Sequence, residues 1–133
     1  RKFITTKKEN SKNVENWGSG NVKREFLHVD DLAEACLFLM QTYNEKQFVN
    51  IGSGEDVMIS ELAFIVKSVV GYDGNLMFNT DKPDGTPRKW MDVTKLKNEG
   101  WQASTGLDEG LKITYQWFLE NIDSFKEVKI SDE

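Results

Sequence analysis

The chain has 133 residues, of which 38% are hydrophobic and 29% charged, a composition typical of one globular domain. Its net charge of −5 comes from interleaved cations and anions, which disfavours a nucleic-acid-binding surface, and no apolar run is long enough to span a membrane. The lone cysteine, Cys36, cannot form an internal disulfide and favours a reducing compartment.

The first eight residues, RKFITTKK, begin without Met, and no apolar stretch follows their cations as it would in a signal peptide. They are typical of the end of a helix, so we expect the sequence to be a piece of a longer protein. Residues 5–15 are polar and show no hydrophobic period, which predicts a loop.

Residues 24–29, REFLHV, alternate in polarity and predict a strand. Apolar residues at helical spacing then predict a helix that begins near Asp31, where Glu34 completes a capping box, and that carries Cys36 on its buried stripe. QFVNIG, residues 47–52, predicts a second short strand.

The second half of the chain predicts a helix capped by Ser60 and ended by Gly71, and then a strand over residues 75–79. Asp92 is a suitable cap for a short helix that ends near NEGW. A last helix is predicted to begin at Thr105 with Asp108 and to continue to Ile122.

These elements predict an α/β fold with a small mixed sheet and helices, in which three or four short strands include some parallel pairs. A sheet of this size usually packs on something larger, so we expect an apolar face that the chain does not cover itself. Residues 1–122 form the predicted domain, and residues 123–133, with few apolar side chains, are predicted to be a flexible tail.

The segment NWGSGNVKREF, residues 16–26, combines a glycine pair with an indole and cations. Trp17 could cover a base or sugar, and the planar guanidinium of Arg24 could grip a phosphate. The alternative is a hairpin with Trp17 in the core and Arg24 in a surface salt bridge.

The segment KPDGTPRKWMD, residues 82–92, has two prolines and a glycine that would present its charged side chains with little entropy to lose. Asp84 could accept hydrogen bonds from a ribose hydroxyl or a guanine, and Lys89 could bind phosphate. Arg88 is the weaker candidate, since it could pair with Asp84 or Asp92 and brace the loop. We expect the candidates of both segments to converge on one cleft that binds a nucleotide diphosphate.

Three other features have simpler interpretations. NIGSGED, residues 50–56, lacks the third glycine and the immediate helix of a dinucleotide-binding fingerprint. His28 is more often a packed or hydrogen-bonded residue than a catalyst, and one His with one Cys cannot supply a metal site. Cys36, on an apolar stripe, is predicted to be an inert buried thiol.

Several stretches resemble the C-terminal half of the GDP-L-fucose synthase family, which consists of extended short-chain dehydrogenases/reductases. They are WGSGNVKREFLHVDDLAEA, VNIGSGED, KPDGTPRKWMDVTKL and the later GW. REF-x-HVDD and DVTKL are shared with wider sugar-nucleotide epimerases and dehydratases, whereas KPDGTPRK is the narrower signature. The resemblance covers roughly residues 1–122 and implies the C-terminal substrate-binding subdomain, with the Rossmann domain missing.

The resemblance also implies roles for particular residues. Carried over by position, the substrate-binding residues are Lys2, Trp17, Arg24, Asp84 and Lys89. The family's catalytic residues and its NADP loop would lie upstream of Arg1, so we expect no catalytic, cofactor-binding or metal-binding residue in this chain.

For the full-length enzyme the resemblance implies conversion of GDP-4-keto-6-deoxy-D-mannose to GDP-L-fucose by 3,5-epimerisation and NADPH-dependent 4-reduction. The implied partners are a GDP-sugar, the missing Rossmann domain and a second copy of the full enzyme, with no nucleic acid and no membrane; the implied location is cytoplasmic. This chain alone is expected to be inactive. Two alternatives remain open: the substrate domain of another nucleotide-sugar epimerase or dehydratase, and a ligand-free interaction module.

Overall fold

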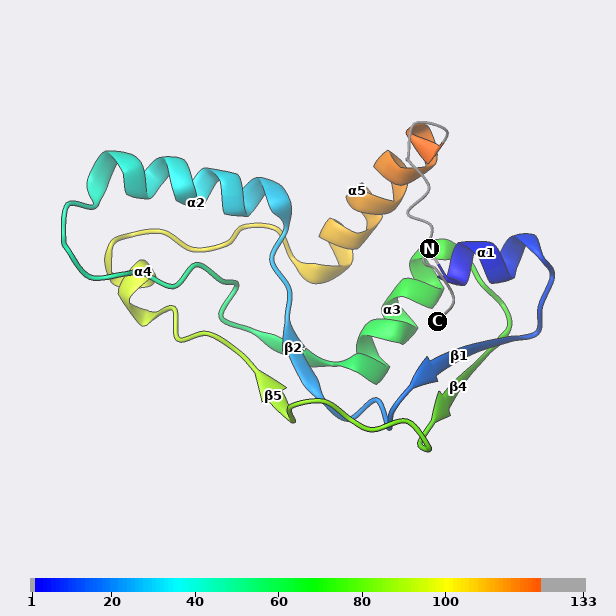
Figure 1. Cartoon of the computed structure of the whole chain (residues 1–133). Helices are drawn as coiled ribbons and strands as arrows, with labels where there is room; N and C mark the ends of the chain where they lie inside the picture. Colours follow the sequence, from blue (N-terminus) through cyan, green and yellow to red (C-terminus); the bar gives the residue numbers. More distant parts are fainter. Residues whose placement is uncertain (1, 123–133) are drawn as a thin grey trace, which may run out of the picture.

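The computed structural model of the chain describes residues 2–122, which form two small lobes joined by a central sheet (Figure 1). The helices are α1 (Lys2–Lys8), α2 (Val29–Thr42), α3 (Ile59–Val70), α4 (Thr94–Asn98) and α5 (Leu107–Glu120). The strands are β1 (Asn13–Trp17), β2 (Lys23–Glu25), β3 (Asp56–Met58), β4 (Asn75–Asn79) and β5 (Arg88–Lys89). The expectation of a mixed α/β fold with short strands is confirmed.

The first lobe is built on the parallel pair β1 and β4, in which Val14 lies opposite Leu76. Helices α1 and α3 pack against this pair, and α5 packs on α3 (Figure 1). The buried side chains of this core are Phe3, Val14, Ala63, Val70 and Tyr72. Because β1 and β4 are far apart in sequence, the lobe depends on long-range pairing.

The central sheet has β2 in the middle, antiparallel to β3 and parallel to β5. Beyond it lies the second lobe, where α2 and α4 enclose a separate core (Figure 1). The buried side chains of that core are Ala35, Leu96 and Trp101. The central sheet therefore carries the segments that the sequence singled out, between two independently packed cores.

Several predicted features are confirmed. The strand over residues 75–79 is β4, and α3 ends at Gly71, whose backbone is left-handed at φ 63°. The short helix predicted after Asp92 is α4, but its N-cap is Val93; Asp92 lies one residue earlier and accepts a hydrogen bond from the backbone N–H of Thr94 at 2.9 Å.

The loop predicted over residues 5–15 is wrong at both ends. Its start belongs to α1, which Phe3 anchors in the first core, and its end belongs to β1. The polar sequence gave no sign of β1, because only Val14 of that strand is buried and the strand exists through its pairing with β4.

The strand predicted over residues 24–29 is shorter than expected, because β2 ends at Glu25 where its short neighbours stop. The helix predicted from Asp31 begins at Val29, and the ring of His28 caps it by accepting a hydrogen bond from the backbone N–H of Asp30 at 3.4 Å. Asp31 is buried and bonds elsewhere, so the predicted capping box is wrong.

Three further expectations need correction. Residues 47–52 form no strand, since no described segment pairs with them. Helix α3 begins one residue before Ser60, and Glu61 closes its first turn through the backbone N–H of Met58 at 2.9 Å. Helix α5 has Gly106 as its N-cap, because Thr105 is occupied by a different partner.

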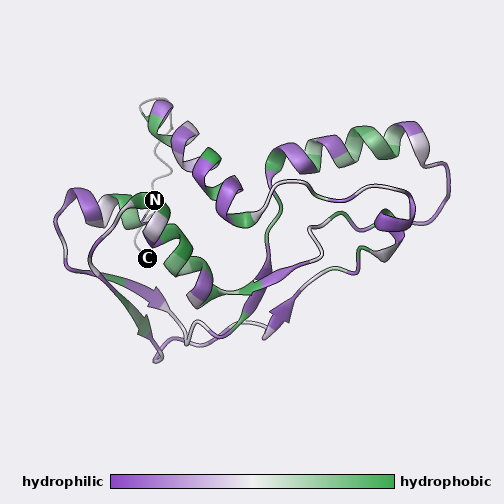
Figure 2. Cartoon of the chain, turned by 180° about the vertical axis from the view of Figure 1, so that it is seen from behind, coloured by the Kyte–Doolittle hydropathy of each residue, from purple (hydrophilic) through white to green (hydrophobic). Residues whose placement is uncertain are grey.

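A face of α2 is apolar and uncovered, in keeping with the expected gap in the chain's own packing. Val29 is 68% exposed, Leu37 60% and Met40 81%. Figure 2 shows hydrophobic stretches along this helix. Phe48, in the unpaired segment after α2, is 86% exposed. Among residues 2–122, no helix has the length and apolar character needed to cross a membrane.

The predicted domain boundary at residue 122 has no structural test, and the predicted tail, residues 123–133, lies outside the described residues.

Candidate functional site

Two cations of the predicted site, Arg24 and Lys89, are direct neighbours across the parallel pair of β2 and β5. Side chains of directly paired residues stand on the same face of a sheet, with strands about 4.8 Å apart. The Arg24 guanidinium donates to the Thr86 carbonyl at 2.8 Å, and it has no carboxylate partner among the described residues. The surface salt bridge of the alternative interpretation is therefore wrong.

The Lys89 side chain is exposed, and no ion pair or hydrogen bond holds its ammonium within residues 2–122. Its positive charge beside Arg24 costs free energy unless an anion neutralises both. A phosphate group matches this arrangement, since Arg supplies a planar fork and Lys a point charge.

Asp84 ties the second candidate segment to the first. Its carboxylate accepts hydrogen bonds from the Ser19 backbone N–H at 2.8 Å and from the Ser19 hydroxyl at 2.7 Å. The hydrogen bonds from the Ser19 side chain and backbone lower the pKa of Asp84. The approach is so close that a Cβ on Gly18, whose φ is +83°, would lie 2.4 Å from the Asp84 Oδ1.

Trp17 lies on the surface directly before this turn. Its side chain is 69% exposed, and the Lys82 ammonium sits 5.3 Å from its ring centre, a cation–π distance. The alternative that buries Trp17 in a hairpin core is wrong, because β1 pairs with β4 rather than with β2. An exposed indole beside a rigid turn is suited to covering a flat ring.

Arg88 braces the loop, but through a different carboxylate from the two that were expected. It forms an ion pair with Asp56, whose side chain is only 7% exposed and which also lies 3.9 Å from the Lys23 ammonium. The Arg88 guanidinium also stacks 4.8 Å from the ring centre of Trp90. Arg88 is therefore engaged by Asp56 and Trp90, which leaves Lys89 as the cation of β5 without a carboxylate partner among residues 2–122.

Lys2 lies against β1, where its ammonium donates to the carbonyl of Glu15. Glu15 lies two residues before Trp17 on β1, whereas within residues 2–122 no hydrogen bond or ion pair joins Lys2 to Arg24 or Lys89. The structure thus gathers Trp17, Asp84 and the cation pair around one loop, and sets Lys2 apart on the β1 side.

The remaining candidates have structural roles or none. The His28 ring caps α2 and would lie 3.1 Å from a Cβ at Gly110, so it is packed and hydrogen-bonded as expected. Cys36 is exposed on the uncovered face of α2, which corrects the prediction of a buried thiol. Within residues 2–122, no group of three or more His, Cys, Asp or Glu side chains could hold a metal ion.

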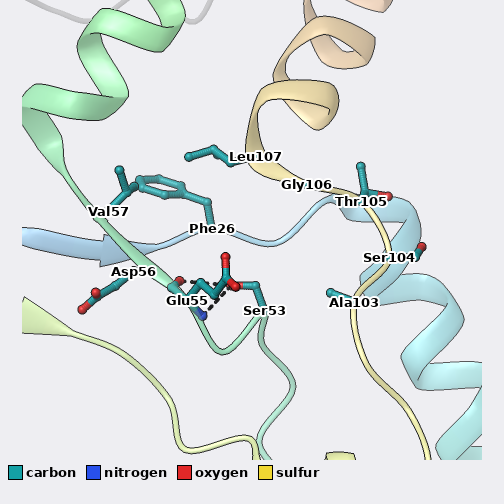
Figure 3. A pocket seen from close by; sticks show the side chains of 10 residues that line it. All are labelled: Phe26, Ser53, Glu55, Asp56, Val57, Ala103, Ser104, Thr105, Gly106 and Leu107. Atoms are coloured by element: carbon teal, nitrogen blue, oxygen red, sulfur yellow. Dashed lines mark hydrogen bonds between the residues drawn. The ribbon is translucent and has the colours of Figure 1, made fainter.

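A cavity of about 270 Å³, which the sequence did not reveal, lies beside the central sheet between β3 and the start of α5. Figure 3 shows Phe26, Val57 and Leu107 pointing toward one another, while Asp56 points away. Val57 is paired with Arg24, so the cavity opens on the face that carries the two cations.

The lining of this cavity does not suit a diphosphate. It includes Glu55 and Asp56, and none of its ten lining residues is a cation. Its apolar side and its hydroxyl groups, from Ser53, Ser104 and Thr105, suit a neutral group. The only sequence signal for this cavity is that Phe26 follows Arg24 by two residues, the spacing that places two side chains on one face of a strand.

Asp31 links α2 to the segment before α5. It is 3% exposed and accepts hydrogen bonds from the Thr105 backbone N–H at 2.9 Å, the Thr105 hydroxyl at 3.0 Å and the Ser104 hydroxyl at 3.1 Å. Burial raises the pKa of Asp31, but the hydrogen bonds from Thr105 and Ser104 together outweigh it and lower that pKa. The residue therefore fixes one wall of the cavity.

Comparison with known proteins gives consistent matches. Residues 1–52 match the model of the NAD dependent epimerase/dehydratase family. The chain is 54% identical over 122 residues to the putative GDP-L-fucose synthase 2 of Arabidopsis thaliana, covering 92% of this chain and 37% of that protein. It is 45% identical to the GDP-L-fucose synthase of Escherichia coli K12, covering 95% of this chain and 42% of that protein.

Solved structures agree. A GDP-L-fucose synthetase from Naegleria fowleri bound to NADP has a TM-score of 0.85 at 28% identity, covering 92% of this chain and 39% of that one. A GDP-mannoheptose C4 reductase from Campylobacter jejuni with NADP bound has a TM-score of 0.80 at 39% identity, covering 90% of this chain and 42% of that one.

The chain is therefore similar in sequence and fold to part of these enzymes, and its residues 1–52 match the NAD dependent epimerase/dehydratase family. The chain spans well under half the length of the relatives it matches. Within that class, its sequence is similar to the GDP-L-fucose synthases.

Proposed function

We propose that this chain is the GDP-sugar-binding part of a GDP-L-fucose synthase. The observation that carries the proposal is the cation pair of Arg24 and Lys89 on one face of the central sheet. Around the same loop, Trp17 offers a flat apolar wall and Asp84 an acceptor beside it. A nucleoside diphosphate has the three matching features: charge, a planar base and hydroxyl donors.

In the complete enzyme, GDP-4-keto-6-deoxy-D-mannose would be converted to GDP-L-fucose by 3,5-epimerisation and 4-reduction. NADP would bind in the rest of the enzyme and supply the hydride for the reduction. The residues of this chain would hold the GDP end, so that binding energy orients the sugar toward the chemistry. The binding role makes the chain necessary for turnover without making any of its side chains catalytic.

The uncovered face of α2 supports the proposal that a Rossmann domain packs there. Leu37 and Met40 are exposed on that helix, and residues 47–52 have no strand partner among the described residues. An added sheet edge would pair with that segment, and its side chains would cover the helix. The family resemblance further supports a homodimer and a cytoplasmic location for the complete enzyme.

Calorimetric titration of the chain with nucleotides tests the binding role. We expect GDP to bind more tightly than GMP, because the diphosphate engages both cations, and more tightly than UDP if the base is read. Arg24→Ala and Lys89→Ala should each weaken GDP binding by roughly tenfold or more, the loss typical of a hydrogen bond to a charged group. Lys12→Ala, an exposed cation before β1, is the matched control.

Two outcomes would decide between the open alternatives. Equal binding of GDP and UDP, or a preference for UDP, would favour another nucleotide-sugar enzyme. No binding by the chain, and no effect of the two variants in a chimera with the remainder of the Escherichia coli relative, would overturn the proposal. A ligand-free module is already disfavoured, because Trp17 is exposed rather than packed.

A separate experiment tests whether the proposed Rossmann domain packs on α2. Met40→Asp should reduce co-purification of the chain with the N-terminal remainder of that relative, whereas Ile113→Asp, an equally apolar change on α5, should not. Light scattering of the assembled enzyme would report whether it is a dimer.

A further inference from the structure

The glycine-rich segment GSG, residues 52–54, holds a carboxylate of the chain itself. Glu25 Oε1 accepts hydrogen bonds from the Gly54 backbone N–H at 2.7 Å and from the Ser53 hydroxyl at 3.3 Å. Backbone N–H groups of glycine loops commonly bind anions, and here the anion is internal. This segment, which was excluded as a dinucleotide-binding site, therefore binds the carboxylate of Glu25.

The fit between this loop and the carboxylate leaves no room for a side chain. A Cβ at Gly52 would lie 2.4 Å from Glu25 Oε1. Gly54 has φ +80°, a conformation that side chains rarely adopt. The two glycines are therefore needed for the loop to close around Glu25.

The other oxygen of the Glu25 carboxylate bonds the backbone of the segment that follows Lys89. Glu25 Oε2 accepts a hydrogen bond from the Met91 backbone N–H at 2.9 Å, two residues after Lys89. The strand that carries Lys89 is only two residues long, so its pairing with β2 alone holds it weakly. Glu25 links the segment that follows β5 both to β2 and to the glycine-rich segment.

Glu25 cannot itself touch an anion held by Arg24 and Lys89. Successive side chains of a strand point to opposite faces, so Glu25 lies on the face opposite to Arg24. We propose that Glu25 is a positioning residue, which holds Lys89 beside Arg24 by bonding the backbone of the segment that follows β5. This inference rests on the anion-binding role proposed above.

The test is calorimetric titration of the 133-residue chain with GDP. Glu25→Ala frees the backbone after Lys89, so GDP binding should weaken by about tenfold, the cost of ordering a loop that was previously fixed. Glu25→Gln keeps the size and one acceptor oxygen, so it should recover part of that loss. Glu9→Ala removes the same charge from an exposed position after α1 and should leave binding unchanged.

A double-mutant cycle separates positioning from general damage. If Glu25 acts through Lys89, Glu25→Ala should weaken GDP binding much less in the Lys89→Ala background than in the wild type. Equal effects in both backgrounds would overturn the inference, as would wild-type affinity of Glu25→Ala. Should that variant fail to fold by circular dichroism, wild-type affinity of Glu25→Gln would overturn it instead.

The result distinguishes this inference from the proposed function. If Lys89→Ala weakens GDP binding while Glu25→Ala does not, the site stands and the positioning role fails. If neither Arg24→Ala nor Lys89→Ala changes GDP binding, the proposed function fails, and the inference fails with it.

Discussion

Replacing the buried carboxylate of Asp31 should destabilise the fold more than replacing an exposed carboxylate in this part of the chain. Asp31 is 3% exposed and accepts hydrogen bonds from the Thr105 backbone N–H, the Thr105 hydroxyl and the Ser104 hydroxyl. In Asp31→Ala the hydroxyls can rotate to new partners, but the Thr105 N–H stays buried without an acceptor. A hydrogen bond to a charged group contributes about 1.5–3 kcal/mol, so we expect a loss of about 3 kcal/mol in the free energy of unfolding.

Urea unfolding followed by tryptophan fluorescence measures this loss. Asp30→Ala is the matched control, because the Asp30 side chain is 84% exposed one residue earlier in the same helix turn. It removes a favourable interaction with the helix dipole, which is worth about 0.3–1 kcal/mol, and an exposed contact of 3.8 Å with His28 Nδ1. Equal losses for the two variants would refute the reasoning.

The pH dependence supplies a second check on Asp31. Its pKa in the folded chain is lowered from 3.8, so the ionised carboxylate stabilises the fold above pH 3.8. That stabilisation is lost as the pH falls below 3.8 and through the folded pKa. The difference in unfolding free energy between wild type and Asp31→Asn should therefore shrink between about pH 5 and pH 2. A difference that stays constant over this range would contradict the assigned hydrogen bonds.

Three further outcomes are expected. Gly18→Ala should destabilise the chain by about 1–2 kcal/mol in urea unfolding, because its backbone is left-handed and the new methyl group would collide with Asp84; an unchanged midpoint would show that the turn is not rigid. Leu96→Ala should cost about 2–5 kcal/mol, since Leu96 is 1% exposed in the second core, and a loss below 1 kcal/mol would mean that this core is loosely packed. The chain alone should oxidise no NADPH with GDP-4-keto-6-deoxy-D-mannose, and measurable turnover would place catalytic groups within it.

The longer helices α2, α3 and α5 were largely predictable because apolar residues recur along them at helical spacing. Helix α3 followed from its apolar spacing and from Gly71, and α4 was expected after Asp92, which accepts from the Thr94 backbone N–H although Val93 is the N-cap. The predicted starts of α2 and α5 were wrong because the expected capping side chains form hydrogen bonds with distant residues instead. Asp31 and Thr105 both have capping side chains, yet they bond each other across the fold.

The strands were harder to predict, for a physical reason. β1 has one buried residue and β5 only two residues in all, so neither carries an alternating pattern. Each exists because a distant segment pairs with it, and a single sequence does not display that pairing. The reverse error occurred at residues 47–52, whose β-branched and apolar residues fit a strand that has no partner among the described residues.

The candidate site was predictable in its residue types but not in its supports. Arg24 and Lys89 were proposed from chemistry, and the structure brings them together through the pairing of β2 with β5, a strand that the sequence did not reveal. Asp84 was expected to face a ligand, whereas both of its oxygens already bond Ser19. Each oxygen has a second lone pair, so Asp84 could still accept a hydrogen bond from a ligand. In this structure its hydrogen bonds fix the loop.

The acidic balance of the chain and its cationic site have a common explanation. Asp56 neutralises Arg88, and the carboxylates of Asp84 and Glu25 accept hydrogen bonds from backbone and hydroxyl groups around the same loop. None of these three carboxylates forms an ion pair with Arg24 or Lys89. These acids therefore fix the loop without pairing with the half-buried Arg24 or the exposed Lys89. An acidic protein can in this way present a small positive site, provided that its carboxylates are bonded to the chain behind that site.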